Sequence, residues 1–180
     1  ASEVVEVIRL ELSGATFEVS GDTAVMRGVI STQTPSCVLE LVFVNPGVRT
    51  LVLQDVPGSI DDVANLRAGR YIRQLGLSTH VPADGMVASG GTDLFLAGAQ
   101  RSAEPGALFG IHSWSGGPVE ATELPRDHED HRLYLDYYRE MGIPADFYWR
   151  TLFAAPPEGN HWMTEEELAR FGFFVGAGAH

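Results

Sequence analysis

The sequence has no lysine, and all twelve of its basic residues are arginine. This absence excludes a catalytic Ser-Lys dyad, and a phosphate clamp for an acyl-coenzyme A would have to use arginine. The 24 acidic residues outnumber the basic ones, so the formal net charge is −12 at pH 7. Because so acidic a chain repels phosphate groups, we expect neither a nucleic acid nor an anionic membrane surface as its partner.

Cysteine and long apolar runs are also scarce. Cys37 is the single cysteine, which excludes an intramolecular disulfide and argues against a structural zinc site. No apolar run reaches the roughly 18 residues that a membrane-spanning helix needs. We therefore expect no membrane span, and the sequence points to no metal and no organic cofactor.

The composition fits one folded unit. Hydrophobic residues make up 44% of the 180 residues and charged residues 20%, which is ordinary for a globular protein. A chain of this length buries a core large enough to be stable without disulfides or metals. We therefore expect a single domain over residues 1–180.

The most informative motif is a serine between small residues. Ser89 follows Ala88 and precedes Gly90, Gly91 and an apolar segment, which is typical of a turn that feeds a helix. At such a turn the backbone N–H groups point toward whatever the hydroxyl attacks, and His112, in a later apolar strand, is a candidate base. The competing interpretation is that Ser89 is an ordinary helix N-cap.

The segments around Ser89 predict crossover units on a parallel sheet. Strands and helices alternate, and the two strand-to-helix turns fall at one sheet edge, where open α/β sheets bind ligands. The predicted elements are a strand over 50–53, a helix over 59–75, a strand over 77–81, a helix after Ser89 and a strand over 107–114.

Outside this unit the sequence predicts three further regions: strands within 1–22, a helix over 35–44 and a helical insert over 120–153. Within the insert, residues 127–141 show the spacing of an amphipathic helix. His128 and His131 lie among its acidic residues, and we expect them on a solvated charged face rather than at a metal. The apolar stripe of this helix consists of Leu133, Tyr134, Tyr137 and Tyr138.

From about Thr23 to Phe174 the sequence resembles the ClpP/crotonase superfamily, and within it the small exported ClpP-like serine peptidases of bacteria. The motifs that carry this resemblance are the turn at 56–59, the small-Ser-small motif at 88–91, Ile111-His112 and the segment 162–168. The resemblance implies an α/β fold, namely a β-β-α superhelix with a mostly parallel sheet and a C-terminal helical insert.

The resemblance also implies assembly and export. The insert is expected to pack subunit on subunit or to roof the site, and its aromatic stripe favours a homo-oligomer. The alternative is that this helix packs on its own domain. The start at Ala1, without a methionine, is typical of a chain after signal cleavage. We expect a periplasmic or secreted protein, with a cytoplasmic location as the alternative.

Site residues follow from the same resemblance. It makes Ser89 the nucleophile and His112 the base, and the N–H groups of Ser59 and Gly90 become the oxyanion hole. The position that usually carries the triad aspartate is Asn160. An asparagine can accept the Nδ1–H of a histidine, but it cannot stabilise an imidazolium as a carboxylate does.

Other residues compete for two of these roles. Glu158 is close to Asn160 in sequence, and Asp93 lies one turn beyond Ser89, so both are alternative acids. His161 is a second candidate for the base. The sequence therefore predicts a serine hydrolase of the peptidase type, acting on a peptide or a small acyl substrate.

The alternative is a protein that keeps the fold without being a peptidase. It would be a crotonase-like acyl-thioester enzyme or a catalytically inactive binding module. Such an enzyme uses the same pair of N–H groups to stabilise an enolate, and Asp93 would then matter more than Ser89.

Overall fold

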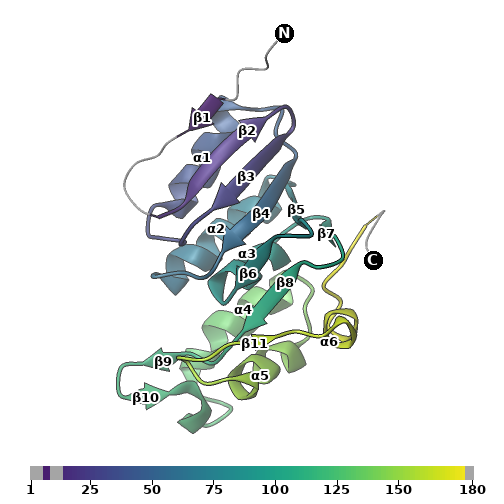
Figure 1. Ribbon diagram of the computed structural model, residues 1–180. Coiled ribbons are helices and arrows are strands. Elements are labelled where there is room, and N and C mark those ends of the chain that lie inside the picture. The colour runs from purple at the N-terminus through teal and green to yellow at the C-terminus, as the bar shows by residue number, and fades with distance from the viewer. Residues whose placement is uncertain (1–5, 9–13, 177–180) are drawn as a thin grey trace.

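The computed structural model describes residues 6–8 and 14–176 (Figure 1). Its centre is a mixed sheet whose main path runs in the order β1-β2-β3-β4-β6-β8-β11, with β5 and β7 attached to one side of β4. The strands of this sheet are β1 (Glu6–Ile8), β2 (Thr16–Ser20), β3 (Thr23–Arg27), β4 (Thr50–Val56), β5 (Ser78–Val81), β6 (Met86–Ala88), β7 (Arg101–Ala103), β8 (Leu108–Ile111) and β11 (His161–Trp162).

Three helices cover one face of this sheet, and two further helices pack at its β8 end (Figure 1). α1, α2 and α3 lie behind the sheet in Figure 1, and α4 and α5 lie beyond β8. The helices are α1 (Thr34–Val44), α2 (Asp62–Gln74), α3 (Gly90–Leu96), α4 (Arg132–Glu140), α5 (Ala145–Ala154) and α6 (Glu165–Arg170). The short elements between β8 and α4 are the hairpin of β9 (Ser115–Gly116) and β10 (Val119–Glu120), and the 3-10 helices η1 (Ala121–Glu123) and η2 (Glu129–His131).

The sheet is mostly parallel around the predicted site. β3 pairs with β4, β4 with both β5 and β6, and β6 with β8, all in parallel. The first half of β4 pairs with β5 and its last two residues pair with β6, so β5 and β6 follow each other along the same side of β4. Antiparallel pairs occur where β1, β2 and β3 meet and where β11 joins β8. The predicted α/β class with a mostly parallel sheet is confirmed at this level.

The predicted elements are found, with shifts at their ends that have local causes. The strand predicted over 50–53 extends to Val56. The helix predicted from Ser59 begins at Asp62, because the Asp61 carboxylate caps it by accepting the N–H of Ala64 at 2.9 Å. The strand predicted over 107–114 ends at Ile111, since the N–H of Ser113 turns out of the ladder to the carbonyl of Ala155.

The strands within 1–22 are present as β1 and β2, and part of that range lies outside the described residues. The predicted helix at 35–44 is α1. The insert over 120–153 contains η1, η2, α4 and α5. Along β2 exposed and buried residues alternate, so that Phe17 and Val19 face the helices.

Of the two alternatives for the aromatic stripe on residues 127–141, packing on the chain's own domain is the one that the structure shows for its two tyrosines nearest the C-terminal end. Tyr137 and Tyr138 are buried against the chain's own core, and the Tyr137 hydroxyl donates to the carbonyl of Asp93 at 2.7 Å. The Tyr137 ring also lies where Gly69 has no side chain, so α4 packs closely on α2. The homo-oligomer stays a prediction, without the support of this stripe.

His131 also differs from its expected place on a solvated face. Its side chain is 1% exposed, and Nδ1 lies 2.7 Å from the Tyr148 hydroxyl. The rings of Tyr148 and Trp149 surround it at centroid distances of 5.6 and 4.9 Å. It is buried because η2 turns it toward α5 and toward Trp114, whose ring centroid lies 6.2 Å away, a direction that helical spacing alone does not reveal.

A buried guanidinium joins the ends of three helices. Arg101 is 4% exposed and donates to carbonyl oxygens of Phe173 (2.6 Å), Gly172 (3.0 Å), Leu96 (3.1 Å) and Met141 (3.4 Å). These carbonyls lie at or just beyond the C-terminal ends of α3, α4 and α6, where helices leave acceptors unpaired. Burial and the charge of Arg73 lower the pKa of Arg101 to about 10. No carboxylate of the described residues bonds to it.

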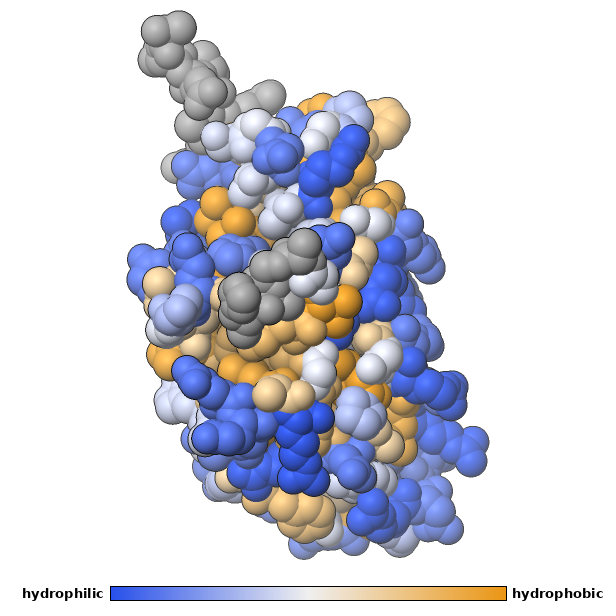
Figure 2. Space-filling view, turned by 90° about the vertical axis from the view of Figure 1, so that its right-hand side faces the viewer, coloured by the Kyte–Doolittle hydropathy of each residue, from blue (hydrophilic) through white to orange (hydrophobic). Residues whose placement is uncertain are grey.

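The surface on the side of β7 and α6 is mixed. Figure 2 shows apolar residues there between hydrophilic ones. A groove between β7 and α6 has a largely apolar lining, which includes Ala103, Pro105, Ala107, Leu168 and Phe174. Within the described residues, no helix has the length and hydropathy that crossing a membrane requires.

Replacing Arg101 with methionine tests the joining of the helix ends. Arg101→Met keeps the bulk but leaves four buried carbonyl oxygens without this donor, so we expect a loss of about 3 kcal/mol or more in the free energy of unfolding. Arg67→Met is the matched control, because Arg67 is exposed on α2, and its effect should stay within about 0.5 kcal/mol. Urea unfolding measures both, and equal effects would contradict the role of Arg101.

Candidate active site

Ser89 has an unusual backbone conformation. Its φ is 54° and its ψ −123°, and it is the single non-glycine residue with positive φ among the described residues. Its N–H donates to Gly110 at 3.0 Å, and its carbonyl accepts from Thr92 at 3.0 Å and Asp93 at 3.2 Å. Such conformations cost about 1–3 kcal/mol and concentrate at functional sites.

The interpretation of Ser89 as an ordinary helix cap does not hold. Ser89 occupies the N-cap position of α3, yet its hydroxyl makes no capping hydrogen bond. Gly91 allows the tight turn, since a Cβ there would collide with the carbonyl oxygen of Val56 at the end of β4. The Ser89 hydroxyl thus makes no capping hydrogen bond to the backbone of α3, and Ser89 lines a cavity.

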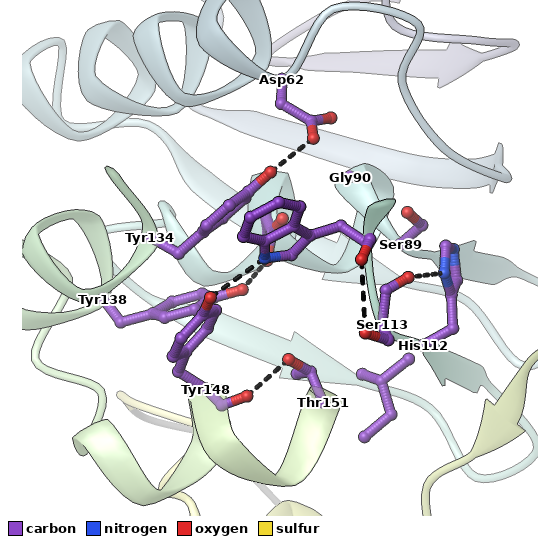
Figure 3. Close-up of a pocket in the computed structure, with 12 residues that line it drawn as sticks. Asp62, Ser89, Gly90, His112, Ser113, Tyr134, Tyr138, Tyr148 and Thr151 are labelled. Atoms are coloured by element: carbon purple, nitrogen blue, oxygen red, sulfur yellow. Dashed lines mark hydrogen bonds between the residues drawn. The ribbon is translucent and has the colours of Figure 1, made fainter. Parts of the chain in front are cut away.

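The cavity lies between α3, the segment after β8 and the helical insert (Figure 3). Its volume is about 40 Å³. Tyrosines of α4 and α5 form one wall, so the insert roofs the site within the same chain. The lining residues are Asp62, Ser89, Gly90, Asp93, Ile111, His112, Ser113, Trp114, Tyr134, Tyr138, Tyr148 and Thr151.

His112 faces the same cavity from the end of β8. Its Nδ1 lies 2.6 Å from the carbonyl oxygen of Ser113 (Figure 3). Because a carbonyl only accepts, Nδ1 carries the proton and Nε2 is left with a lone pair. The structure shows no hydrogen bond between His112 and Ser89, and such bonds are often long before a substrate is bound.

Asn160 lies beside His112 but makes no hydrogen bond to it. It precedes β11, whose antiparallel register pairs His161 with Ile111 and Trp162 with Gly110, so the next pair along is Asn160 and His112. The Asn160 side chain is exposed and leans over Gly110, where a Cβ would collide with its Oδ1. In this structure the carbonyl of Ser113, not Asn160, holds the histidine.

The two alternative acids lie in different places. Glu158 is exposed and is not part of the cavity lining, whereas Asp93 is half-buried and lines the cavity. Burial raises the pKa of Asp93 to about 7. The hydrogen bond from the Tyr138 hydroxyl opposes this shift, and the charge of Asp62 adds to it.

The predicted oxyanion groups come together next to Ser89. A Cβ on Gly58 would lie 3.6 Å from the Ser89 Cβ, and one on Gly90 would lie 2.6 Å from the Ser59 Oγ. Ile30 forms an isolated parallel bridge with Ser59, in which the N–H of Ile30 donates to the carbonyl of Gly58 and the N–H of Ile60 donates to the carbonyl of Ile30. The N–H of Ser59 therefore points away from Ile30. The N–H groups of Ser59 and Gly90 are thus near the nucleophile and have no backbone acceptor among the described residues.

His161 is held in an ion-pair cluster instead of the cavity. Its Nε2 lies 2.8 Å from Oε2 of Glu167, and Arg150 contacts the other carboxylate oxygen, Oε1, at 2.7 Å. Burial raises the pKa of Glu167, but the hydrogen bonds from His161, Thr164 and Arg150 outweigh it and lower the pKa to about 2. His112 is therefore the better placed candidate base.

Sequence reasoning missed most of the cavity wall. Tyr134 and Tyr138 are four residues apart on one helix face, which could have marked them as neighbours. Nothing in the sequence showed that Asp62, Tyr148 or Thr151 would meet them. Asp62 accepts hydrogen bonds from Ser59 at 2.7 Å and from Tyr134 at 2.6 Å.

The described residues contain no group of three or more His, Cys, Asp or Glu that could hold a metal.

No protein-family model and no curated protein matches this sequence. Among solved structures, the chain is similar to a mutant of the 1510-N membrane-bound stomatin-specific protease, with a TM-score of 0.57 and 17% sequence identity. The alignment covers 87% of this chain and 79% of that one. This chain shares the fold of that protease. At this identity the likeness speaks for the fold alone.

The raised pKa of Asp93 predicts how stability depends on pH. The unfolded carboxyl loses its proton near pH 4 and the folded one near pH 7, so its contribution to stability falls as pH rises through that window. Asp93→Asn keeps an acceptor for Tyr138, and we expect it to stabilise the protein at pH 8 by about 1–2 kcal/mol, with little effect at pH 4. Urea unfolding at both pH values measures this, with the exposed Asp127→Asn as control. An equal effect of Asp93→Asn at both pH values would contradict the assignment.

Proposed function

We propose that this protein is a serine hydrolase of the peptidase type. The observation that carries the proposal is the placement of Ser89. Its hydroxyl is on a positive-φ turn, makes no capping bond, and faces one cavity together with His112. Such a turn presents a nucleophile to substrate while the backbone N–H groups beside it stay available.

The acylation step uses these groups in order. Ser89 Oγ forms a bond to the substrate carbonyl carbon, and His112 Nε2 takes the hydroxyl proton. The negative charge moves to the carbonyl oxygen, where the N–H groups of Ser59 and Gly90 stabilise it. When the tetrahedral intermediate collapses, His112 gives the proton to the leaving amine and an acyl-serine remains.

Deacylation repeats the sequence with water. His112 Nε2 takes a proton from the water as its oxygen bonds to the acyl carbon, and the same N–H groups hold the oxyanion. The bond to Ser89 Oγ then breaks, and His112 returns the proton to the serine. The products are a carboxylic acid and the free enzyme.

The fold supports this choice of reaction class. The chain shares its fold with a protease, and its motifs resemble those of ClpP-like serine peptidases within the ClpP/crotonase superfamily. The departure from that pattern is Asn160, which stands where the triad aspartate is usual. We propose that the Ser113 carbonyl orients His112 through Nδ1–H, so that a base without a carboxylate partner gives a slow enzyme.

A crotonase-like acyl-thioester reaction is the second candidate. The observation in its favour is Asp93, a carboxyl group in the cavity whose pKa is raised to about 7, as an acid-base group requires. Against it, the cavity lining holds no arginine, and this lysine-free chain would need one to bind the phosphates of a coenzyme A thioester. The hydrolase remains the better supported proposal.

Covalent labelling tests the nucleophile. A fluorophosphonate should label the protein at Ser89, since the reagent's phosphorus accepts the hydroxyl oxygen as the acyl carbon does. Ser89→Ala should abolish the labelling. Ser102→Ala is the matched control, because Ser102 also contacts a histidine, His80, at 2.8 Å, but on adjacent strands without the turn. Folded protein that stays unlabelled over hours, or a label that survives Ser89→Ala, would contradict the proposal.

Substitutions of Asn160 test how His112 is oriented. Because Nδ1–H already has the Ser113 carbonyl, Asn160→Ala should change the hydrolysis rate of an activated ester by less than about threefold. Asn160→Asp places a carboxylate beside His112 and should raise the rate by about tenfold or more, through stabilisation of the imidazolium. A loss of more than about a hundredfold in Asn160→Ala would show instead that Asn160 is the orienting residue.

A further inference from the structure

We propose that the cavity beside Ser89 selects substrates that carry a primary ammonium group, as a lysine side chain does, next to the bond that is cleaved. This inference rests on the proposed hydrolase function and adds a substrate class to it. Three properties of the cavity support it, namely its charge, its aromatic wall and its size.

The charge of the cavity is negative. Asp62 and Asp93 both line it, from the first residue of α2 and from α3. Their hydrogen-bond partners are hydroxyl groups, of Ser59 and Tyr134 for Asp62 and of Tyr138 for Asp93. Hydroxyl groups satisfy the carboxylate oxygens without cancelling their charge, so a cation in the cavity would gain from both.

No salt bridge among the described residues involves either Asp62 or Asp93. The lining contains no arginine, and the charged group that acts on Asp93 is Asp62. Arg70, on the neighbouring face of α2, is already paired with Glu140 at 2.6 Å. The pKa of Asp93 is raised because burial is not compensated by a cation, and a bound ammonium group would supply that compensation.

The aromatic wall suits an alkyl chain that ends in a charge. The ring of Tyr134 stacks against that of Trp114 and against that of Tyr148, with centroids 5.7 and 5.6 Å apart. Tyr148 is fixed further by the Trp114 indole N–H, which donates to its hydroxyl at 3.0 Å. Methylene groups can pack along such a rigid wall while the charged end reaches the carboxylates, as amphipathic side chains do at surfaces.

The size of the cavity favours an ammonium over a guanidinium. A volume of about 40 Å³ holds about two or three waters, or one compact charged group. The ammonium of lysine is a compact point charge on a thin stem, whereas the guanidinium of arginine is a wider planar group. An acidic side chain of the same length would be repelled by Asp62 and Asp93. We therefore expect lysine to be preferred over arginine, and both over glutamate.

A matched set of fluorogenic peptide amides tests this selectivity. The residue before the reporter amine is lysine, its neutral isostere norleucine, arginine or glutamate, and kcat/KM is measured at pH 8, where Asp93 is mostly ionised. We expect lysine to exceed norleucine by about tenfold or more, because each tenfold step needs only about 1.4 kcal/mol of charge-dependent binding. Equal rates for lysine and norleucine would overturn the inference.

Variants show whether the two carboxylates cause the preference. Asp62→Asn and Asp93→Asn keep oxygen acceptors and remove one charge each, so each should lower the lysine-to-norleucine ratio by about threefold or more. The double variant should bring the ratio close to one. Glu40→Gln is the control, because Glu40 is exposed on α1 and its loss changes the net charge by the same amount. A ratio that responds equally to Glu40→Gln would indicate long-range steering and overturn the inference.

Two further measurements separate this inference from the proposed function. Failure of the fluorophosphonate to label Ser89 counts against the hydrolase, whereas labelling without a lysine preference counts against the cation site alone. Binding is also measured without catalysis, by calorimetry of Ser89→Ala with the Nα-acetyl amides of lysine and norleucine. Tighter binding of the lysine compound, lost in the double aspartate variant, supports the cation site, and equal binding of the two compounds overturns it.

Discussion

The arrangement of the site depends on two arginines that bind the ends of helices. Arg73 and Arg101 both donate to the carbonyl of Leu96, at the end of α3, and both reach the carbonyl of Met141, just after α4. α3 carries Asp93 and follows Ser89, while α4 carries Tyr134 and Tyr138 on the facing wall. Because a guanidinium offers five donors in a fixed plane, it fixes the two helices relative to each other. The cavity between them therefore has a defined shape before any substrate enters.

The turn at Ser89 shows a second constraint, which is steric. Its positive φ is kept in place by a hydrogen bond to Gly110, and three glycines surround it at positions where a side chain would collide. Gly91 lies against Val56 of β4, Gly90 against Ser59, and Gly110 against Asn160. These contacts hold the ends of β4, β6 and β8 close together, at the sheet edge where these parallel strands end. A strained serine persists there because the surrounding backbone leaves it no alternative conformation.

The electrostatics of the site follow from the absence of lysine and from the paired state of the nearby arginines. Arg70 is bound to Glu140, and Arg73 and Arg101 are bound to carbonyl groups, so none of them reaches Asp93. A buried carboxyl without a cation has a raised pKa, and the wall around it supplies hydroxyl groups instead of charge. The catalytic and selective parts of the proposed site thus share one cavity, which Ser89, His112, Asp62 and Asp93 all line.

The sequence by itself determined the local parts of this protein. Alternating strands and helices, the turns at Gly58-Ser59 and Ser89-Gly90, and the location of Ser89 and His112 at one sheet edge could be predicted because they depend on local sequence patterns and on the handedness of crossover connections. The walls of the cavity could not be predicted. Whether Tyr138 faces solvent or Asp93, and whether His112 bonds to Asn160 or to the Ser113 carbonyl, was decided by how α4 and β11 pack against distant elements. Periodicity identifies an apolar helix face, but the neighbour that covers it is set by packing between segments many residues apart.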